Sequence, residues 1–483
     1  MGIPRIIYLI NGMLKAQKSS PEYVQQLQEK RFRKLLHHAY NNSAFYRKLY
    51  QGVDLDRCKI TDLPVVTKPD MMNNYDDFVT RSDLKRADLR KWVSDKNNLG
   101  KMYLNKYIVF QTSGTTGENA LIVYDRRAMD FVHACVMARQ PKNETPTILT
   151  QIREFFSLLF NTHRYAAVLM DGGPYPAFTV ALFSPDRHGI FVKEKIFSLM
   201  DPTADLVRKL NDFQPDSMFS YPSLLNILAR EQMQGRLSIR MDSSMSVLSS
   251  GSEPLNTTTR KAAMKAWDIN IQDTYGSSEC FVMARSCHKF DRMHVMNDIC
   301  ILEIVDRHNN PVPDGQPGNK VLLTNLFNHV QPFIRYEISD VTGISTNPCD
   351  CEWPFPCLLP VEGRTDDIFY IDRPTGGYEA VHPYLFLGPI VELDEVREYQ
   401  LVQTGRNEVT FNYVPSIGVG DIENRVREVL MAGLQNAKLV DRINLVTCCV
   451  KEIPRDKKSG KFRQIVSKVG TPENLDESER IEH

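Results

Sequence analysis

Hydroxyl residues and glycines crowd one stretch of the sequence, Gln111 to Gly117, which has the sequence QTSGTTG. The stretch follows an apolar run at residues 107–110 and contains four hydroxyl residues and two glycines. Glycines let the backbone approach a ligand closely, and Ser and Thr hydroxyls donate hydrogen bonds, so such a loop can wrap the oxygens of a polyphosphate. It is not a Walker A loop, because Glu118 follows Gly117 where that motif has a lysine. The alternative interpretation is a Ser/Thr-rich surface turn.

A second polar stretch, Asp273 to Glu279, follows a β-branched pattern at residues 269–271. An acidic residue beside hydroxyls can hold Mg²⁺ on a nucleotide phosphate, because that ion prefers oxygen ligands. Three further charged segments lie at residues 335–340, 363–367 and 454–463. Each of them, taken alone, is also compatible with a solvated charged turn.

Together, in this order and at these separations, the five segments resemble the motifs of the adenylate-forming superfamily of acyl-CoA synthetases, luciferases and peptide-synthetase adenylation domains. The stretch from Arg31 to Arg47 is similar to the opening helices of its phenylacetate-CoA ligase-like family. The resemblance covers roughly residues 25–468. It implies an α/β fold, with a large N-terminal layered α/β domain and a small mobile α+β C-terminal domain.

The resemblance also implies an AMP-forming acid-thiol ligase. A carboxylate would attack the α-phosphate of ATP to give an acyl-adenylate and pyrophosphate, and the thiol of coenzyme A would then displace AMP. Aromatic and small residues in the expected acyl pocket favour an aryl acid, although fatty acids and amino acids stay open. The expected pocket residues are Gly173, Tyr175, Phe178, Tyr221, Ser250 and Gly251. Alternatives are transfer of the acyl group to an amine, a hydroxyl or a carrier protein, and a non-catalytic nucleotide-binding homologue.

Carried over position by position, the resemblance gives catalytic roles to three residues. Lys461 would bridge the carboxylate and the α-phosphate during adenylation, Glu279 would help to hold Mg²⁺, and Thr115 would bind the departing phosphates. Asp366 falls at the family's hinge, about which the small domain would swing. The other expected nucleotide contacts are Ser113, Gly114, Thr116 and Gly117 of the phosphate loop, Ser252, Glu253 and Pro254 at the adenine, Asp273, Thr274, Tyr275, Gly276 and Ser278 within the second stretch, and Asp340 and Arg364 at the ribose.

Two positions depart from the family pattern. Glu118 and Asn119 stand where a basic residue often follows the phosphate loop, and Glu337 replaces the second basic residue of the ribose motif. Neither position carries a central role, but both are expected to weaken ATP binding or to mark a specialised member.

Three cysteines and one histidine have the spacing of metal ligands. The four residues are Cys287, His294, Cys349 and Cys351. Four nitrogen and sulfur ligands suit tetrahedral structural zinc, and the spacing resembles the zinc-bearing branch of the phenylacetate-CoA ligase-like family. Such a Zn²⁺ site would stabilise the large domain rather than act in the chemistry. Reduced, half-buried thiols are the alternative, and His288 or Cys357 could replace one of the ligands.

The elements that must position these residues follow from the hydrophobic pattern. Residues 1–100 are predicted to form a largely helical cap, and from residue 107 short apolar runs alternate with helical patterns, as is typical of an α/β fold. Later, β-like runs at 408–414 and 442–450 flank a helical pattern at 421–434, which predicts a small α+β domain. The expected domains are residues 1–365 for ATP and acyl binding, 366–469 as a lid, and 470–483 as a flexible acidic tail.

The composition limits the classes of partner that the protein is expected to bind. The 483 residues contain 59 Lys and Arg against 59 Asp and Glu, so the neutral chain is not expected to capture nucleic acid or an anionic membrane. The early apolar run at residues 6–10 is far too short to cross a bilayer, which needs about 20 residues, and it has no cleavage site of a secretory signal. We therefore expect a cytoplasmic protein whose partners are small molecules. Relatives of this kind are often homodimers.

Overall fold

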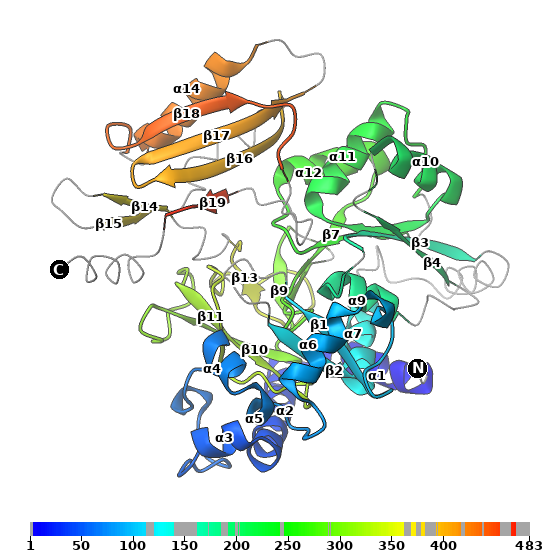
Figure 1. Cartoon of the computed structure of the whole chain (residues 1–483), viewed down its shortest axis with the longest axis vertical. Helices are drawn as coiled ribbons and strands as arrows, with labels where there is room; N and C mark the ends of the chain where they lie inside the picture. Colours follow the sequence, from blue (N-terminus) through cyan, green and yellow to red (C-terminus); the bar gives the residue numbers. More distant parts are fainter. Residues whose placement is uncertain are drawn as a thin grey trace. The chain divides into compact units, whose positions relative to one another are not determined.

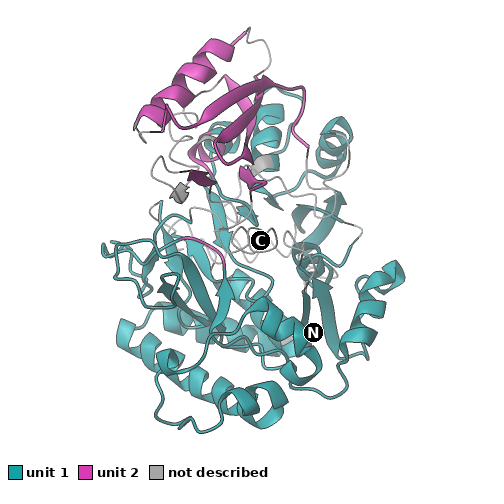
Figure 2. Cartoon of the chain, turned by 60° about the vertical axis from the view of Figure 1, so that its left-hand side comes forward, with its two compact units in different colours: residues 1–255, 262–338, 342–361 teal, residues 256–261, 339–341, 362–483 magenta. Residues whose placement is uncertain are grey.

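The structure is a computed structural model, and every structural statement below concerns the residues that it describes. These are residues 3–112, 120–139, 162–171, 173–184, 192–198, 201, 203–241, 246–287, 289, 291–361, 369–372, 378–381, 393, 395–416, 421–436, 439–454 and 465–469. The chain divides into two compact units (Figure 2). Met1–Leu255, Ala262–Ile338 and Thr342–Val361 form the first unit, and Asn256–Lys261, Ser339–Val341 and Glu362–His483 form the second.

Helices make up most of the first hundred residues (Figure 1). They are α1 (Ile3–Gln17), α2 (Pro21–Asn42), α3 (Ala44–Leu49), α4 (Lys68–Asn73), α5 (Tyr75–Phe78) and α6 (Arg86–Ser94), with short 3₁₀ turns at Ile60–Asp62 and Lys96–Asn98. The Ser20 side chain caps α2, and proline occupies the first turn, where its missing N–H costs nothing. Ser43 ends α2 and caps α3 with its hydroxyl, so a single residue sets the bend between the two helices.

An eight-stranded sheet forms the centre of the first unit, in the order β13-β9-β8-β7-β6-β5-β3-β4. The strands are β3 (His163–Leu169), β4 (Val192–Ser198), β5 (Ser217–Ser220), β6 (Leu248–Gly251), β7 (Ile271–Tyr275), β8 (Ala284–Ser286), β9 (Met293–Val295) and β13 (Cys357–Leu358). The strands from β4 to β7 pair in parallel, whereas β7, β8, β9 and β13 pair antiparallel. The alternation of apolar runs and helices in the sequence therefore forms a layered α/β unit.

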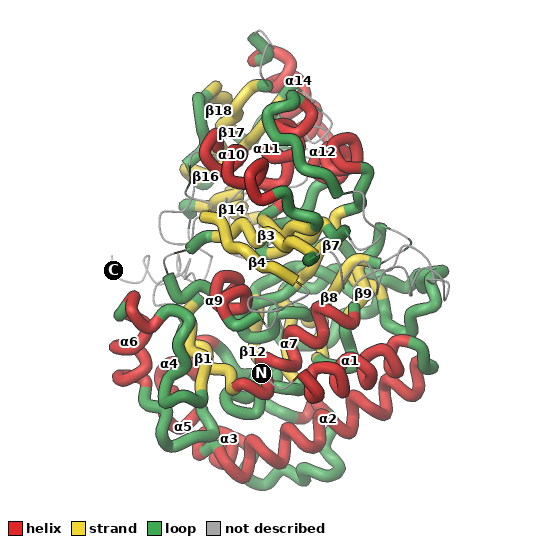
Figure 3. Tube along the Cα trace, turned by 90° about the vertical axis from the view of Figure 1, so that its right-hand side faces the viewer, coloured by secondary structure: helices red, strands yellow, loops and turns green. Residues whose placement is uncertain are grey.

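Helices cover both faces of the parallel part of this sheet (Figure 3). Apolar side chains of α10 (Thr203–Phe213), α11 (Pro222–Met233) and α12 (Thr257–Trp267) form one core with it. On the other face, α9 (Pro176–Leu182) packs against β3 through Ala177 and Ala181. With both faces covered, ligands have access to the sheet at the ends of its strands.

A second core joins the N-terminal helices to two smaller sheets. One is the antiparallel pair β1 (Tyr107–Gln111) and β2 (Leu121–Asp125), which is followed by α7 (Arg126–Ala138). The other contains β10 (Cys300–Val305), β11 (Lys320–Asn325) and β12 (Tyr336–Ile338). This core therefore positions Gln111, at which the first predicted segment begins, and residues 336–338 of the segment predicted at 335–340.

The second unit has its own core. Its four-stranded sheet has the order β18-β17-β16-β19, with β16 (Val396–Gly405), β17 (Glu408–Pro415), β18 (Asn444–Cys449) and β19 (Ile465–Ser467), and it packs against α14 (Glu423–Asn436). A separate strand pair is formed by β14 (Phe369–Asp372) and β15 (Tyr378–Val381).

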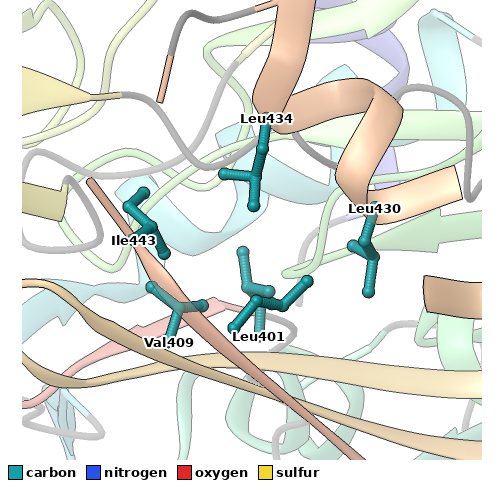
Figure 4. Close-up of a pocket in the computed structure, with 6 residues that line it drawn as sticks. Leu401, Val409, Leu430, Leu434 and Ile443 are labelled. Carbon is teal, nitrogen blue, oxygen red and sulfur yellow. The ribbon is translucent and has the colours of Figure 1, made fainter. Parts of the chain in front are cut away.

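A cavity of about 10 Å³ lies between α14 and this sheet, with only aliphatic side chains around it (Figure 4). Its lining is Leu401, Val409, Leu430, Leu434, Ile443 and Leu445. The space is at most that of one water molecule, and a water there would find no polar partner. It is therefore a packing void and not a ligand site. Within the described residues, no helix is long and apolar enough to cross a membrane.

Candidate active site

The carboxyl ends of β6 and β7 bring two predicted segments side by side. Ser250 is paired with Asp273, and Gly251 with Thr274, so the turn that begins at Ser252 emerges next to Tyr275 and Gly276. In open α/β sheets, ligands bind at this edge, outside the carboxyl ends of the parallel strands. The expected adenine-contacting turn and the expected Mg²⁺-binding stretch therefore share one edge of the sheet, with Glu253 and Pro254 following in the same turn.

The backbone at this edge is tightly constrained. Ser252 adopts a φ of +69°, in the left-handed region that side chains disfavour. A Cβ on Gly276 would lie 2.1 Å from the carbonyl oxygen of Phe281, and one on Gly251 would lie 3.2 Å from that of Thr274. Glycine is therefore required at position 276, where the chain folds back so that Ser277 and Cys280 exchange backbone hydrogen bonds. This turn contains Ser278 and Glu279.

Ser250 and Asp273 form a buried hydrogen-bonded pair beneath the edge. The Ser250 hydroxyl donates to the Asp273 carboxylate at 2.7 Å, and the backbone N–H of Asp273 donates to the Ser286 hydroxyl at 2.9 Å. Both side chains are less than a tenth exposed. This network ties β6, β7 and β8 together directly below the turn.

Glu279 is held by side chains from other strands. Its carbonyl oxygen accepts hydrogen bonds from the Asn325 amide at 2.7 Å and from the Tyr124 hydroxyl at 3.0 Å. Burial, followed by the charge of Glu279, raises the pKa of Tyr336 well above its ordinary value, so its phenol stays protonated. Asn325, Tyr124 and Tyr336 are not among the site residues predicted from the sequence. The one available signal was that Tyr336 lies within the segment at 335–340.

Two of the expected acyl-pocket residues lie in the loop that follows β3. Gly173 and Tyr175 follow β3, and the neighbouring carbonyl of Pro174 accepts the N–H of Gln111 at 3.0 Å. This bond ties the loop after β3 to the end of β1. A Cβ on Gly173 would lie 2.5 Å from the Tyr175 ring, so glycine lets that ring fold back on the loop. Tyr221 is buried in the core on which Tyr175 also packs.

The remaining expected acyl contact, Phe178, lies half-buried in α9. Asp340 is buried two residues beyond β12. Glu337, the departure from the ribose motif, forms an ion pair with Lys320 of the neighbouring strand, 2.6 Å between Nζ and Oε2. Its carboxylate is therefore balanced by a cation from β11.

The four expected metal ligands come together. Their ligand atoms all lie within 4.8 Å of one another, in Cys287, His294, Cys349 and Cys351. The sulfurs of Cys287 and Cys349 are 3.7 Å apart, and the Cys351 sulfur is 3.2 Å from Nε2 of His294. Two sulfurs at tetrahedral corners around zinc, each at about 2.3 Å, would be about 3.8 Å apart. The donor set and its spacing fit a tetrahedral zinc ion.

Hydrogen bonds from neighbouring groups orient the side chains of this cluster. Nδ1 of His294 is 2.8 Å from the carbonyl oxygen of Phe355, so a proton on Nδ1 leaves the lone pair of the ring on Nε2, which lies 3.2 Å from the Cys351 sulfur. The backbone N–H of Lys289 donates to the Cys287 sulfur at 3.4 Å. Burial raises the pKa of Cys351 to about 12, so metal binding would release its proton. Cys357, 3.8 Å from Nδ1, lies on the far side of the ring from Nε2.

The chain is similar to known AMP-binding enzymes. The family model described as AMP-binding enzyme matches residues 104–322. Phenylacetate-coenzyme A ligase of Thermus thermophilus is 25% identical over 363 residues, 72% of each chain, and the Escherichia coli protein of the same name is 26% identical over 367 residues, 74% of each. The predicted resemblance to the adenylate-forming superfamily is confirmed by these matches.

Solved structures agree with this superfamily's fold. A 2-hydroxyisobutyryl-CoA ligase in the postadenylation state, in complex with 2-HIB-AMP, matches with a TM-score of 0.67 at 18% identity, over 95% of this chain and 92% of that one. The same ligase with 2-HIB-AMP and CoA in the thioesterification state gives 0.56 at 19% identity, over 96% and 94%. The predicted α/β fold class, with a large N-terminal and a small C-terminal domain, is confirmed.

Several of the expected site residues lie outside the described part of the chain and stay predictions. They are Ser113, Gly114, Thr115, Thr116, Gly117, Arg364, Asp366 and Lys461. The described ends of the phosphate loop are joined, since the N–H of Thr112 donates to the carbonyl of Ala120 at 2.9 Å, and the N–H of Ala120 donates to the Thr112 hydroxyl at 3.0 Å. Thr112 and Ala120 therefore lie side by side at the ends of β1 and β2.

Proposed function

We propose that this protein uses ATP and Mg²⁺ to convert a carboxylic acid to an acyl-adenylate with release of pyrophosphate, and then transfers the acyl group to coenzyme A. An aryl acid is the favoured substrate. The observation that supports this most directly is the shared strand edge, where the turn at Ser252 lies beside Tyr275 and the turn with Glu279. The names of the curated relatives, phenylacetate-coenzyme A ligases, support the choice of acid and acceptor.

In the first half-reaction, a carboxylate oxygen attacks the α-phosphorus, and the bond from that phosphorus to the bridging oxygen of pyrophosphate breaks. Tyr275 would stack on the purine, and Asp340 would accept hydrogen bonds from the ribose hydroxyls. Glu279 would hold Mg²⁺, which neutralises phosphate charge when bound. Its buried carboxylate on a backbone fixed by Asn325 suits an oxygen-preferring ion. Lys461 would stabilise the negative charge that builds on the α-phosphate.

In the second half-reaction, the sulfur of coenzyme A attacks the acyl carbon, and the bond from that carbon to the AMP oxygen breaks. The AMP leaves as a stable phosphate monoester, whereas the original carboxylate would have been a poor electrophile. Rotation of the small domain about Asp366 would exchange Lys461 for the thiol between the two steps.

The cysteine–histidine cluster would hold a structural zinc ion. Cys287 directly follows β8, His294 is the middle residue of β9, and Cys349 and Cys351 lie in the loop before β13. Zinc would therefore fasten that loop to the edge of the main sheet, where β13 pairs with β9. No described acidic side chain belongs to the cluster to act as a base on a bound water, so its role would be structural.

The experiment is to mix the purified protein with ATP, Mg²⁺ and a panel of aryl, fatty and amino acids, and to follow pyrophosphate release with and without coenzyme A. Acid-dependent release that disappears in Lys461→Ala, with further turnover when coenzyme A is added, would support the proposal. Release with no response to coenzyme A would favour an amine, hydroxyl or carrier-protein acceptor. If no acid gives release above the Lys461→Ala background, the enzymatic proposal is wrong and a nucleotide-binding homologue remains.

A further inference from the structure

Three buried amide side chains follow one another at every third residue from the end of β11 toward β12. They are Asn325, Asn328 and Gln331, here called the amide row, and each is 0% exposed. We propose that the amide row positions β2, the strand that follows the expected phosphate loop in sequence, relative to the turn that contains Glu279. This inference rests on the nucleotide-binding roles that the proposed function gives to the loop and to Glu279.

Two members of the row bind the backbone of β2. The N–H of Val123 donates to Oε1 of Gln331 at 2.8 Å, and Nε2 of Gln331 donates to the carbonyl of Leu121 at 3.1 Å. Nδ2 of Asn328 donates to the carbonyl of Val123 at 3.0 Å. Within the described residues β2 pairs only with β1, so these amides occupy the place of a third strand. They fix β2 along its length, because a shift of one residue would break all three bonds.

The row is itself held in one conformation by its own backbone. Oδ1 of Asn325 accepts the N–H of Phe327 at 3.0 Å and that of Asn328 at 3.1 Å. Oδ1 of Asn328 accepts the N–H of Val330 at 3.2 Å and that of Gln331 at 3.4 Å. Turns in which an Asn side chain binds the backbone two or three residues further on fix a segment that is neither helix nor strand. The NH₂ groups of both asparagines are therefore available to bind other elements.

The first member of the row binds the Glu279 turn. Nδ2 of Asn325 donates to the carbonyl of Glu279 at 2.7 Å, and the hydroxyl of Tyr124, a residue of β2, donates to the same oxygen at 3.0 Å. The Tyr124 ring packs against Phe110 and Phe281, with centroids 5.6 and 5.3 Å away. The backbone of Glu279 is therefore joined to β2 twice, directly through Tyr124 and indirectly through the amide row.

The two elements that the row joins belong to the two parts of a phosphate site. β2 begins shortly after Gly117, where the expected phosphate loop ends, and Glu279 is the expected ligand of the divalent cation. A polyphosphate that is bound by the loop and by the cation at once requires a fixed separation between them. Supporting hydrogen bonds that are satisfied before the ligand arrives supply such a separation. A role in stability alone would not require the same row to bind both elements.

The test measures how much Mg²⁺ strengthens the binding of an ATP analogue that has a methylene group between its α- and β-phosphorus. Isothermal titration calorimetry gives the dissociation constants with EDTA and with Mg²⁺, and their ratio is the Mg²⁺ enhancement. We expect Gln331→Met, which keeps the length of the side chain but loses its bonds to β2, to reduce this ratio about tenfold. Glu279→Gln should largely remove the enhancement, and adding Gln331→Met to it should change the ratio less than twofold, because the row acts through the placement of Glu279.

Gln403→Met is the matched control. Gln403 of β16 is also a 0% exposed amide, and it pairs with the N–H and the carbonyl of Tyr370 at 3.4 and 2.9 Å. This variant makes the same change in the second unit and should keep the Mg²⁺ enhancement within twofold of the parent protein. Urea unfolding of all variants measures a loss of stability separately, since such a loss alone would leave the ratio unchanged.

Tyr124→Phe replaces Gln331→Met if that variant does not fold. It keeps the buried ring and removes only the hydroxyl that joins β2 to the carbonyl of Glu279. The Mg²⁺ enhancement should then fall at least threefold, as the loss of one hydrogen bond would predict.

The inference is overturned if Gln331→Met, or Tyr124→Phe in its place, keeps the Mg²⁺ enhancement within twofold of the parent protein, or if Gln403→Met reduces it as much. It is also overturned if Glu279→Gln or the parent protein shows that Mg²⁺ binding does not involve Glu279, through an unchanged ratio in the former or no enhancement in the latter. Failure of the proposed function is a different result, the absence of acid-dependent pyrophosphate release in the parent protein. Because binding of the analogue is measured without any acid, the two results are independent.

Discussion

Replacing Asp298 with alanine is expected to lower the free energy of unfolding of the large unit by about 3–5 kcal/mol, the usual cost of removing one partner from a buried ion pair. Arg139 and Asp298 are both 0% exposed, and Nη2 lies 2.8 Å from Oδ2. Arg31 of α2 approaches the same carboxylate oxygen at 3.8 Å. Burial lowers the pKa of Arg31 and Asp298 opposes that shift. Without the carboxylate, two guanidinium groups would repel each other in the core.

The assay is urea unfolding followed by circular dichroism and tryptophan fluorescence, with the double variant Arg139→Met and Asp298→Leu as control. Replacing both charges by apolar side chains of similar size leaves neither a buried unpaired carboxylate nor the fully buried arginine, so the double variant should recover most of the loss. The reasoning is refuted if Asp298→Ala costs less than about 1 kcal/mol, or if the double variant is no more stable than the single one.

Three other changes have clear expected outcomes. Gly276→Ala should reduce the rate of pyrophosphate release at least tenfold, because its Cβ would lie 2.1 Å from the Phe281 carbonyl oxygen. Gly12→Ala is the control and should leave the rate unchanged, because no atom lies within 4 Å of its added Cβ. Equal rates in the two variants would contradict the prediction. Cys351→Ser should lose about one equivalent of zinc in metal analysis and should unfold at a lower urea concentration. Cys448→Ser, which lies outside the cluster, should keep the zinc content and the unfolding midpoint of the parent protein. A full equivalent of zinc in Cys351→Ser would refute the site. Burial lowers the pKa of His133 from 6.5 to about 4, so between these pH values only the unfolded chain takes up this proton. The free energy of unfolding, measured in urea titrations, should therefore fall by up to about 3 kcal/mol as the pH drops from 6.5 to 4. In His133→Gln this part of the pH dependence should be absent. A pH dependence equal to that of the parent protein would contradict the assignment.

The hydrophobic pattern predicted those strands and helices whose own residues show a clear period. The β-like runs at 408–414 and 442–450 form β17 and β18, and the helical pattern at 421–434 forms α14, with bounds shifted by two residues or fewer at each end. β16 and β19 were not identified. β19 has only three residues and pairs in parallel with β16, so its formation depends on a strand far away in the sequence.

The metal cluster shows which part of a site a sequence can specify. Ligand type and spacing predicted the four side chains that come together, since a tetrahedral site requires few and definite atoms. The support of those side chains was not predictable. The carbonyl of Phe355 that orients His294 is a backbone group, which any residue would supply, and the Phe355 ring lies against the buried Arg139, 4.5 Å from the guanidinium carbon to the ring centroid.

Glu337 illustrates how a departure from a family pattern changes meaning once the fold is known. In sequence, an acidic residue in place of a basic one suggests weaker binding of an anionic nucleotide. In the structure, Lys320 on the neighbouring strand lies 2.6 Å from the Glu337 carboxylate, and both side chains are partly buried, where an ion pair is screened less than at the surface. The pair adds no net charge to this part of β11 and β12. The departure at Glu337 therefore does not argue for an inactive homologue, and the phosphate loop, where Glu118 and Asn119 replace the basic residue, is left as the position at which specialised ATP binding would arise.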